Sequence, residues 1–195
     1  MAFEPGLLQT DLSGLAPLHR VAFCASCCQR MLPNYDKFHR MEDWGSPHLL
    51  RQALHDVWAF LRGQVLAADR IEALARHCSE AAPDTEVFSS LYTSSALDAA
   101  SATVETLRCC TDGDTERGVR VATSARDTVD MYIQMRDKFE ASGPAMEETI
   151  ARDPLMVREV QKQDRDLDQL KATRALTPEF LASLRQSSSY DILSA

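Results

Sequence analysis

Three closely spaced cysteines are the residues of this chain that most readily suggest chemistry. Cys24, Cys27 and Cys28 have a C-x-x-C-C spacing, which could hold a metal ion or take part in redox chemistry. Structural zinc sites need four ligands, usually with a second closely spaced pair, and no second C-x-x-C motif is present. The remaining cysteines supply no matching pair; they are Cys78, Cys109 and Cys110. We predict reduced thiols that pack as small hydrophobic residues, with no metal site and no cofactor.

Other catalytic signatures are also missing from the sequence. Carboxylate-bridged metal sites in helical bundles use Glu-x-x-His pairs on two helices, whereas this chain has only the reversed spacing of His39 and Glu42. No nucleophile motif, P-loop or dinucleotide-binding glycine pattern occurs. We therefore name no catalytic residue, and the sequence favours a protein that is not an enzyme.

The stretch from Arg30 to Tyr35 holds the best candidates for a specific role. Arg30 lies near the end of an apolar helical pattern, where the helix dipole favours a cation. Asn34 can bond to the backbone of its own turn, and Tyr35 can bury its ring while its hydroxyl finds an acceptor. Two interpretations remain open: a structural clamp, in which Arg30 pairs with a buried carboxylate such as Asp56 or Asp98, or a recognition site.

Asp98 is unusual because it interrupts an otherwise apolar helical pattern. The spacing of Ser95 and Asp98 predicts a capping box at the start of a helix. On a helical wheel Asp98 also falls beside Ser101 and Glu105, away from the apolar residues. This polar face either is solvated or meets a partner.

The elements that must position these residues are helices. Apolar residues recur at helical spacing, and no alternating strand patterns with hairpin turns are found. We predict an all-α, single-domain helical bundle of about seven to nine helices over residues 1–185, with residues 186–195 as a frayed tail. Because Pro33 cannot continue the hydrogen-bond ladder, the helix from Pro17 should end at Leu32, and a short helix should follow from Tyr35 to Glu42.

Composition restricts the class of partner. The 195 residues carry a formal net charge of −8, and 45% are hydrophobic. Protein surfaces that bind nucleic acids need clustered Lys and Arg, so we predict no nucleic-acid partner. The charges from Arg158 to Lys171 mix both signs, which indicates a solvated helix face.

No apolar run is long enough to span a bilayer and no secretory signal is seen, so we predict a cytoplasmic protein that does not bind membranes.

The first half of the chain resembles a known family. The stretch Cys28–Tyr35, followed by Phe38, resembles the pattern E-R-M/L-x-P-N-Y-x-x-F of the YjaG-like family of bacterial helical proteins, a domain of unknown function. Asp56 and Trp58 match the aspartate and tryptophan that the family carries on its next helix. Gln29 departs from the pattern, in which glutamate is usual.

The resemblance continues through most of the chain. Pro83-Asp84 and Leu97-Asp98-Ala99 are similar to the segments I-P-x-x-x-x-F and A-I/L-D-A of the family, and Pro154-Leu155-Met156 with Glu159 resembles its late P-L/A-x-x-x-E segment. Ser94-Ser95 stands where a Tyr-Pro is common. The resemblance implies an all-α cytoplasmic fold and brings no activity, cofactor or catalytic residue.

These observations leave three functional hypotheses. The first is a non-catalytic module that binds another protein or a second copy of itself. A sharper form is an acidic inhibitor or immunity-type protein that masks a basic toxin or nuclease, because acidic charge steers a protein toward a positive partner. The third is an enzyme or small-ligand protein with a pocket between helices near Arg30, Tyr35 and Asp98.

Overall fold

The helices of this chain form one bundle in the computed structural model, which describes residues 5–139 and 142–194. Within these residues there are nine helices and no strand, which confirms the predicted all-α class. They are α1 (Pro5–Ser13), α2 (Pro17–Glu42), α3 (Pro47–Leu61), α4 (Ala68–Glu80), α5 (Thr93–Asp112), α6 (Thr115–Asp137), α7 (Pro144–Arg152), α8 (Pro154–Ala172) and α9 (Pro178–Ser187).

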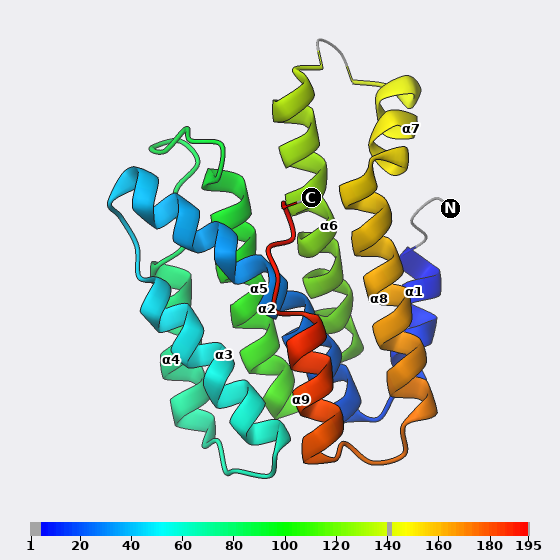
Figure 1. Ribbon diagram of the computed structural model, residues 1–195. Coiled ribbons are helices and arrows are strands. Elements are labelled where there is room, and N and C mark those ends of the chain that lie inside the picture. Colours follow the sequence, from blue (N-terminus) through cyan, green and yellow to red (C-terminus); the bar gives the residue numbers. More distant parts are fainter. Residues whose placement is uncertain (1–4, 140–141, 195) are drawn as a thin grey trace.

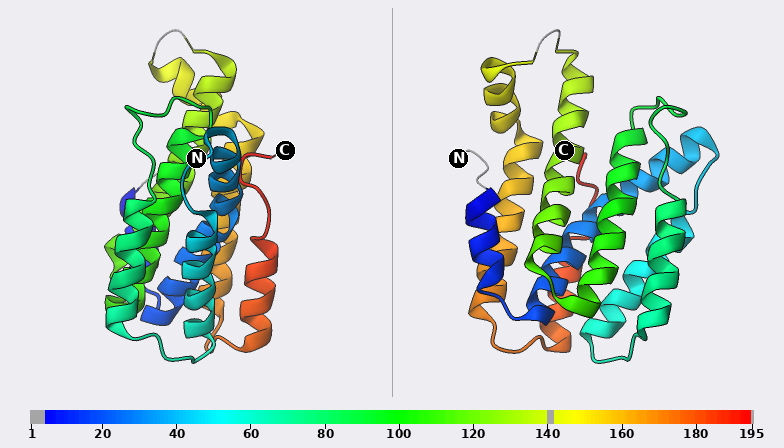
Figure 2. Two further views of the ribbon diagram at one scale, coloured as in Figure 1. Left: turned by 90° about the vertical axis from the view of Figure 1, so that its left-hand side faces the viewer. Right: turned by 180° about the vertical axis from the view of Figure 1, so that it is seen from behind.

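Helix α2 is the centre of the bundle. It contacts α3, α5, α6, α8 and α9, while α4 packs on α5, and α1 packs on α6 (Figure 1). The far end of α6, together with α7 and the start of α8, extends beyond the neighbouring helices (Figure 2). None of the described helices is long and apolar enough to cross a membrane.

Most helix starts follow local sequence signals. A proline occupies the first turn where its missing N–H costs nothing, at Pro17, Pro47, Pro144, Pro154 and Pro178. The side chains of Asp114, Asp153 and Thr177 accept a hydrogen bond from the first turn of α6, α8 and α9. The sequence did not predict α7, a helix of nine residues between Gly143 and Asp153.

The predicted break at Pro33 is wrong. Helix α2 runs without interruption from Pro17 to Glu42, with Pro33 inside it. A proline inside a helix costs about 3 kcal/mol, but Met31, Tyr35 and Phe38 on either side are completely buried. Burial of such large side chains returns about 1.5–3 kcal/mol each. Tertiary packing therefore outweighs the local cost of the proline.

The C-terminal segment, residues 188–194, also differs from the expected frayed tail. Ile192 and Leu193 are buried, and Ser188 is completely buried. The backbone N–H of Ile192 donates a hydrogen bond of 3.0 Å to the carbonyl of Arg30 on α2. The segment thus packs along the middle of α2, near Pro33. Two apolar residues are too short a pattern to predict this from the sequence.

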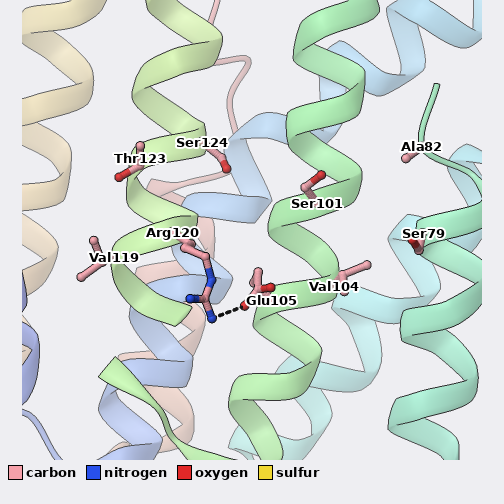
Figure 3. Close-up of a pocket in the computed structure, with 9 residues that line it drawn as sticks. All are labelled: Ser79, Ala82, Ser101, Val104, Glu105, Val119, Arg120, Thr123 and Ser124. Carbon is pink, nitrogen blue, oxygen red and sulfur yellow. Dashed lines mark hydrogen bonds and ion pairs between the residues drawn. The ribbon is translucent and has the colours of Figure 1, made fainter. Parts of the chain in front are cut away.

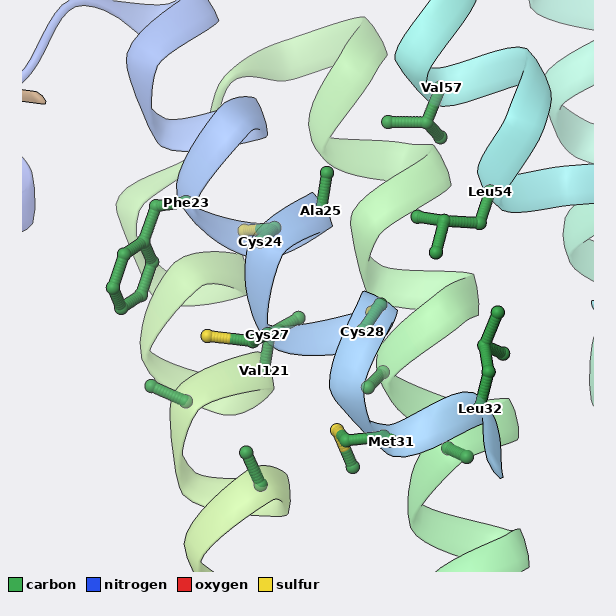
Figure 4. Packing of buried hydrophobic residues seen from close by; sticks show 14 of the residues in the cluster. Phe23, Cys24, Ala25, Cys27, Cys28, Met31, Leu32, Leu54, Val57 and Val121 are labelled. Carbon is green, nitrogen blue, oxygen red and sulfur yellow. The ribbon is translucent and has the colours of Figure 1, made fainter. Parts of the chain in front are cut away.

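The core is built from small and medium side chains around α2. Phe23, Cys24, Cys27, Cys28 and Met31 of α2 belong to this core, in which α2 packs on α5, α6 and α3 (Figure 4). The six cysteines are free thiols, five of them buried. Burial raises the pKa of Cys27 to about 11 and that of Cys28 to about 12. A thiol must ionise to react as a nucleophile, so these cysteines are packing residues.

Candidate functional site

Arg30 forms a two-point ion pair with Glu159 on α8. Its Nε and Nη2 atoms each donate a hydrogen bond of 2.6 Å to a different carboxylate oxygen of Glu159. Both side chains are completely buried. The expected pairing of Arg30 with Asp56 or Asp98 is therefore wrong, because the guanidinium of Arg30 donates its hydrogen bonds to Glu159 instead.

A wider polar network surrounds this ion pair. Nη1 of Arg30 lies 3.8 Å from Asp166, and the hydroxyl of Ser26 donates a hydrogen bond of 2.5 Å to the same carboxylate. Lys162 also pairs with Asp166, and the Gln163 amide donates to Glu159 at 2.7 Å. The side chains that α8 contributes to this network are buried. Asp164, Arg165, Asp168 and Lys171 are exposed, so the predicted solvated face accounts for only part of the mixed charges of this helix.

Asn34 lies one turn beyond Arg30 on α2. Its side chain is completely buried, and neither amide atom has a hydrogen-bond partner within the described residues. The expected bond to the backbone of its own turn is therefore not formed. A buried amide without partners costs free energy, and nothing in the structure explains its presence.

Tyr35 joins three parts of the fold. Its hydroxyl donates a hydrogen bond of 2.5 Å to the carbonyl of Ala81, which follows α4. The same oxygen accepts a bond of 3.1 Å from the N–H of Ser46, which precedes α3. Gly45 lies against the ring with a φ of +87°, and a Cβ there would lie 2.4 Å from the tyrosine oxygen. Only glycine allows this close approach.

Asp56 takes part in a contact that is separate from the Arg30 network. Its carboxylate accepts hydrogen bonds from Gln52, one turn earlier on α3, and from Arg70 on α4, at 2.7 and 3.3 Å. It is thus part of a partly exposed contact between α3 and α4. Asp56 does not contribute to a common site with Arg30.

Asp98 faces α6. Its carboxylate accepts a hydrogen bond of 2.9 Å from the hydroxyl of Thr128. Burial, together with a smaller effect of the nearby charge of Asp127, raises the pKa of Asp98 to about 6. The predicted capping box is wrong, because α5 already begins at Thr93 and the Ser95 hydroxyl donates to the carbonyl of Tyr92.

An open cavity of about 390 Å³ lies one helical turn from Asp98, between α4, α5 and α6 (Figure 3). Arg120 donates a hydrogen bond of 3.0 Å to Glu105, and Arg117 donates one of 2.9 Å to the same carboxylate. The apolar part of the cavity lining is formed by Ala82, Val104 and Val119. The hydroxyl groups of the lining belong to Ser79, Ser101, Thr123 and Ser124.

The cavity and Asp98 share one surface. Ser101 is three residues after Asp98 on α5, and Thr128 is four residues after Ser124 on α6, so each pair lies on the same side of its helix. We call this surface the α5–α6 face and define it by Asp98, Ser101, Glu105, Arg120, Ser124, Asp127 and Thr128. The structure thus confirms that Ser101 and Glu105 lie beside Asp98 on α5, whereas no motif in the sequence indicated the residues that α6 contributes.

Arg30, Tyr35 and Asp98 do not meet in a cavity. Arg30 lies within the α2–α8 network, Tyr35 lies at the junction of α2 with α3 and α4, and Asp98 lies on the α5–α6 face. None of the three lines the cavity of Figure 3 or a second one of about 440 Å³ beside Pro33. Glu159, the residue that sequence reasoning missed as the partner of Arg30, belongs to the late P-L-x-x-x-E segment.

Sequence comparison assigns the chain to a protein family. The family model described as "Protein of unknown function (DUF416)" matches residues 8–194. The chain belongs to the DUF416 family. It is 27% identical over 172 residues to the uncharacterized protein YjaG of Escherichia coli K12, covering 84% of this chain and 87% of that protein. The similarity to YjaG-like proteins that the Arg30–Tyr35 stretch indicated is thereby confirmed.

A solved structure of another DUF416 protein has the same fold. The crystal structure of a family member from Shewanella baltica OS155 superimposes with a TM-score of 0.83 and 23% sequence identity, and it covers 92% of each chain. At this identity the likeness concerns the fold alone. The DUF416 relatives therefore establish the fold of this chain, and they assign no activity.

Proposed function

We propose that this protein is a non-catalytic helical module whose α5–α6 face binds a positively charged segment of another protein. The observation that carries the proposal is a pair of carboxylates, Asp98 and Asp127, each about one helical turn from residues that line an open cavity. Within the described residues, neither carboxylate forms an ion pair with a lysine, arginine or histidine.

Two other carboxylates of limited exposure are neutralised by arginines. Glu105 on the same face lies between Arg117 and Arg120, and Asp153 pairs with Arg136 at 2.6 Å. Asp98, in contrast, has one hydroxyl donor and an acidic neighbour. Removing a carboxylate from water without a cation costs free energy. A lysine or arginine of a bound partner would supply the missing cation.

The cavity beside the acidic pair supports a protein segment as the occupant. Its mixture of hydroxyls and small apolar side chains suits a side chain inserted from a partner. The net charge of −8 would steer a basic partner toward the surface. An acidic inhibitor that masks a basic protein is the sharper form of this proposal. We further propose a cytoplasmic location, which the free thiol state of the six cysteines supports.

Arg30 is assigned a different role. Because its guanidinium is completely buried and bonded to Glu159, it is not accessible to a partner. We infer that Arg30, Tyr35 and Glu159 act as a structural clamp that holds α2 against α8 and against the loops around α3 and α4. Arg30, Tyr35 and Asp98 make their contacts at three separate places within the described residues, which speaks against the small-ligand alternative there.

Capture experiments with matched variants test the proposal. The intact protein, the double variant Asp98→Asn/Asp127→Asn and the control Asp168→Asn/Glu179→Gln would each be immobilised and exposed to a bacterial lysate. Both double variants remove two negative charges. Asp168 and Glu179 are exposed and have no ion-pair partner within the described residues. Bound proteins are identified and quantified by mass spectrometry.

We expect a basic protein to be captured by the wild type and the control and to be lost by at least about tenfold from the Asp98/Asp127 variant, because two charge-assisted contacts are worth about 1.5–3 kcal/mol each. Equal capture by all three proteins would overturn the proposal. Sedimentation velocity provides the second measurement. A dimer that the Asp98/Asp127 substitutions dissociate would identify a second copy of this chain, and not a basic protein, as the occupant.

A further inference from the structure

A small cavity of about 240 Å³ lies where α8 meets the end of α9 and the C-terminal segment. Three cationic side chains of α8 line it: Arg158, Lys162 and Arg165. Tyr190 and Asp191 of the C-terminal segment close the other side. Such a concentration of positive charge stands out in a chain of net charge −8.

Two of these cations, Arg158 and Arg165, form no ion pair with a carboxylate within the described residues. The guanidinium of Arg158 donates to the backbone carbonyls of Ser194, Asp191 and Ile192 at 2.5, 3.3 and 2.8 Å. Carbonyls satisfy its N–H groups but carry no net charge. Arg165 is exposed and forms neither a hydrogen bond nor an ion pair within the described residues.

Two hydrogen-bond donors beside the cavity, on Lys162 and Tyr190, have N–H or O–H groups without an acceptor in the described residues. The ammonium of Lys162 has three N–H groups, and its one acceptor within the described residues is Asp166, which is shared with Arg30 and Ser26. The hydroxyl of Tyr190 is buried and has no partner in the same residues. The carboxylate that lines the cavity, Asp191, is paired with Lys37.

We propose that this cavity binds a phosphate group, as inorganic phosphate or as the phosphate of a small monoester. A tetrahedral oxyanion there would accept hydrogen bonds from Arg165, Lys162 and Tyr190 and would balance the surplus positive charge. Planar guanidinium groups and ammonium groups are the usual partners of phosphate in proteins. The site uses α8, α9 and the C-terminal segment, so it is independent of the α5–α6 face.

The bound anion would link two parts of the fold. Arg165 and Lys162 belong to α8, and Tyr190 belongs to the C-terminal segment. Phosphate binding should therefore hold the C-terminal segment against α8 and raise the melting temperature, as any ligand that binds the folded state does.

Titration of the full chain tests this site. Amide chemical shifts in ¹H–¹⁵N spectra would be followed during addition of inorganic phosphate, of phenyl phosphate and of sodium chloride at matched ionic strength. Three variants are compared: Arg165→Gln, Tyr190→Phe and the control Arg174→Gln. Arg174 is also exposed and without a partner within the described residues, but it does not line the cavity.

We expect saturable phosphate binding in the wild type and in Arg174→Gln, with shifts at residues 188–194. Because charge-assisted bonds are the strong ones, Arg165→Gln should weaken the affinity about tenfold or more, and Tyr190→Phe about threefold to tenfold. Tighter binding of phenyl phosphate would identify a monoester as the ligand, whereas binding of inorganic phosphate alone would identify the free ion. Shifts that chloride reproduces, or equal affinities in Arg165→Gln and Arg174→Gln, would overturn the proposal.

Discussion

At the scale of single residues, Arg30 and Asp98 behave in opposite ways. Arg30 meets Glu159 through two hydrogen bonds of 2.6 Å, whereas Asp98 has one hydroxyl donor and no cation within the described residues. A need for a buried partner could be predicted for Arg30 from its place in an apolar helix. The identity of that partner could not, because Glu159 is 129 residues away in the chain, and several carboxylates were equally compatible.

Removing one member of the Arg30–Glu159 pair should be strongly destabilising. Arg30→Ala leaves Glu159 buried and unpaired, which costs about 3–5 kcal/mol. The joint replacement Arg30→Met/Glu159→Leu removes both charges and should cost much less. Urea unfolding measures both, with Arg152→Ala as the control. Arg152 forms an exposed ion pair with Glu148, worth at most about 1 kcal/mol. A small effect of Arg30→Ala would contradict the clamp.

Asp98 makes the stability depend on pH. Its pKa of about 6 in the folded protein lies above the ordinary value near 4, so folding favours the protonated form. This contribution is present below about pH 4 and is lost as the pH rises from about 4 to about 6. Asp98→Asn should therefore raise the free energy of unfolding by about 1–3 kcal/mol at pH 7 and by little at pH 4. A destabilised variant at pH 7 would indicate a structural role.

At the scale of elements, tertiary contacts decide where α2 ends. The sequence correctly predicts most helices from apolar spacing, from prolines in first turns and from caps such as Asp114. It places the wrong boundary at Pro33, because local rules do not include the burial of Tyr35 and Phe38. The same reason explains the C-terminal segment, where the partner of Ile192 is the distant carbonyl of Arg30.

The junction between α2 and α3 offers a controlled test of the role of Tyr35. Gly45→Ala must strain a φ of +87° and place a methyl group against the tyrosine hydroxyl, whereas Gly63→Ala meets the same backbone strain at a φ of +90° with nothing within 4 Å. We expect Gly63→Ala to cost about 1 kcal/mol and Gly45→Ala about 2 kcal/mol more, measured by chemical unfolding. Equal losses would show that Tyr35 does not restrict this turn.

At the scale of the whole molecule, the fold and the binding surface draw on different parts of the chain. The family resemblance of the Arg30–Tyr35 stretch predicted the all-α DUF416 architecture correctly. It did not point to the α5–α6 face, because Arg120, Ser124 and Asp127 form no motif in the sequence. They meet Asp98 and Ser101 only when α6 packs on α5.

The most direct test asks whether the buried Arg30–Glu159 pair stabilises the fold while the α5–α6 face binds the partner. It compares capture of a lysate protein by Arg30→Met/Glu159→Leu and by Asp98→Asn at pH 7. We predict that the first variant, folded but without the buried ion pair, captures the basic partner as the wild type does. Asp98→Asn should be at least as stable as the wild type and lose at least about tenfold in capture. Lost capture in the folded Arg30/Glu159 variant together with full capture by Asp98→Asn would contradict the account.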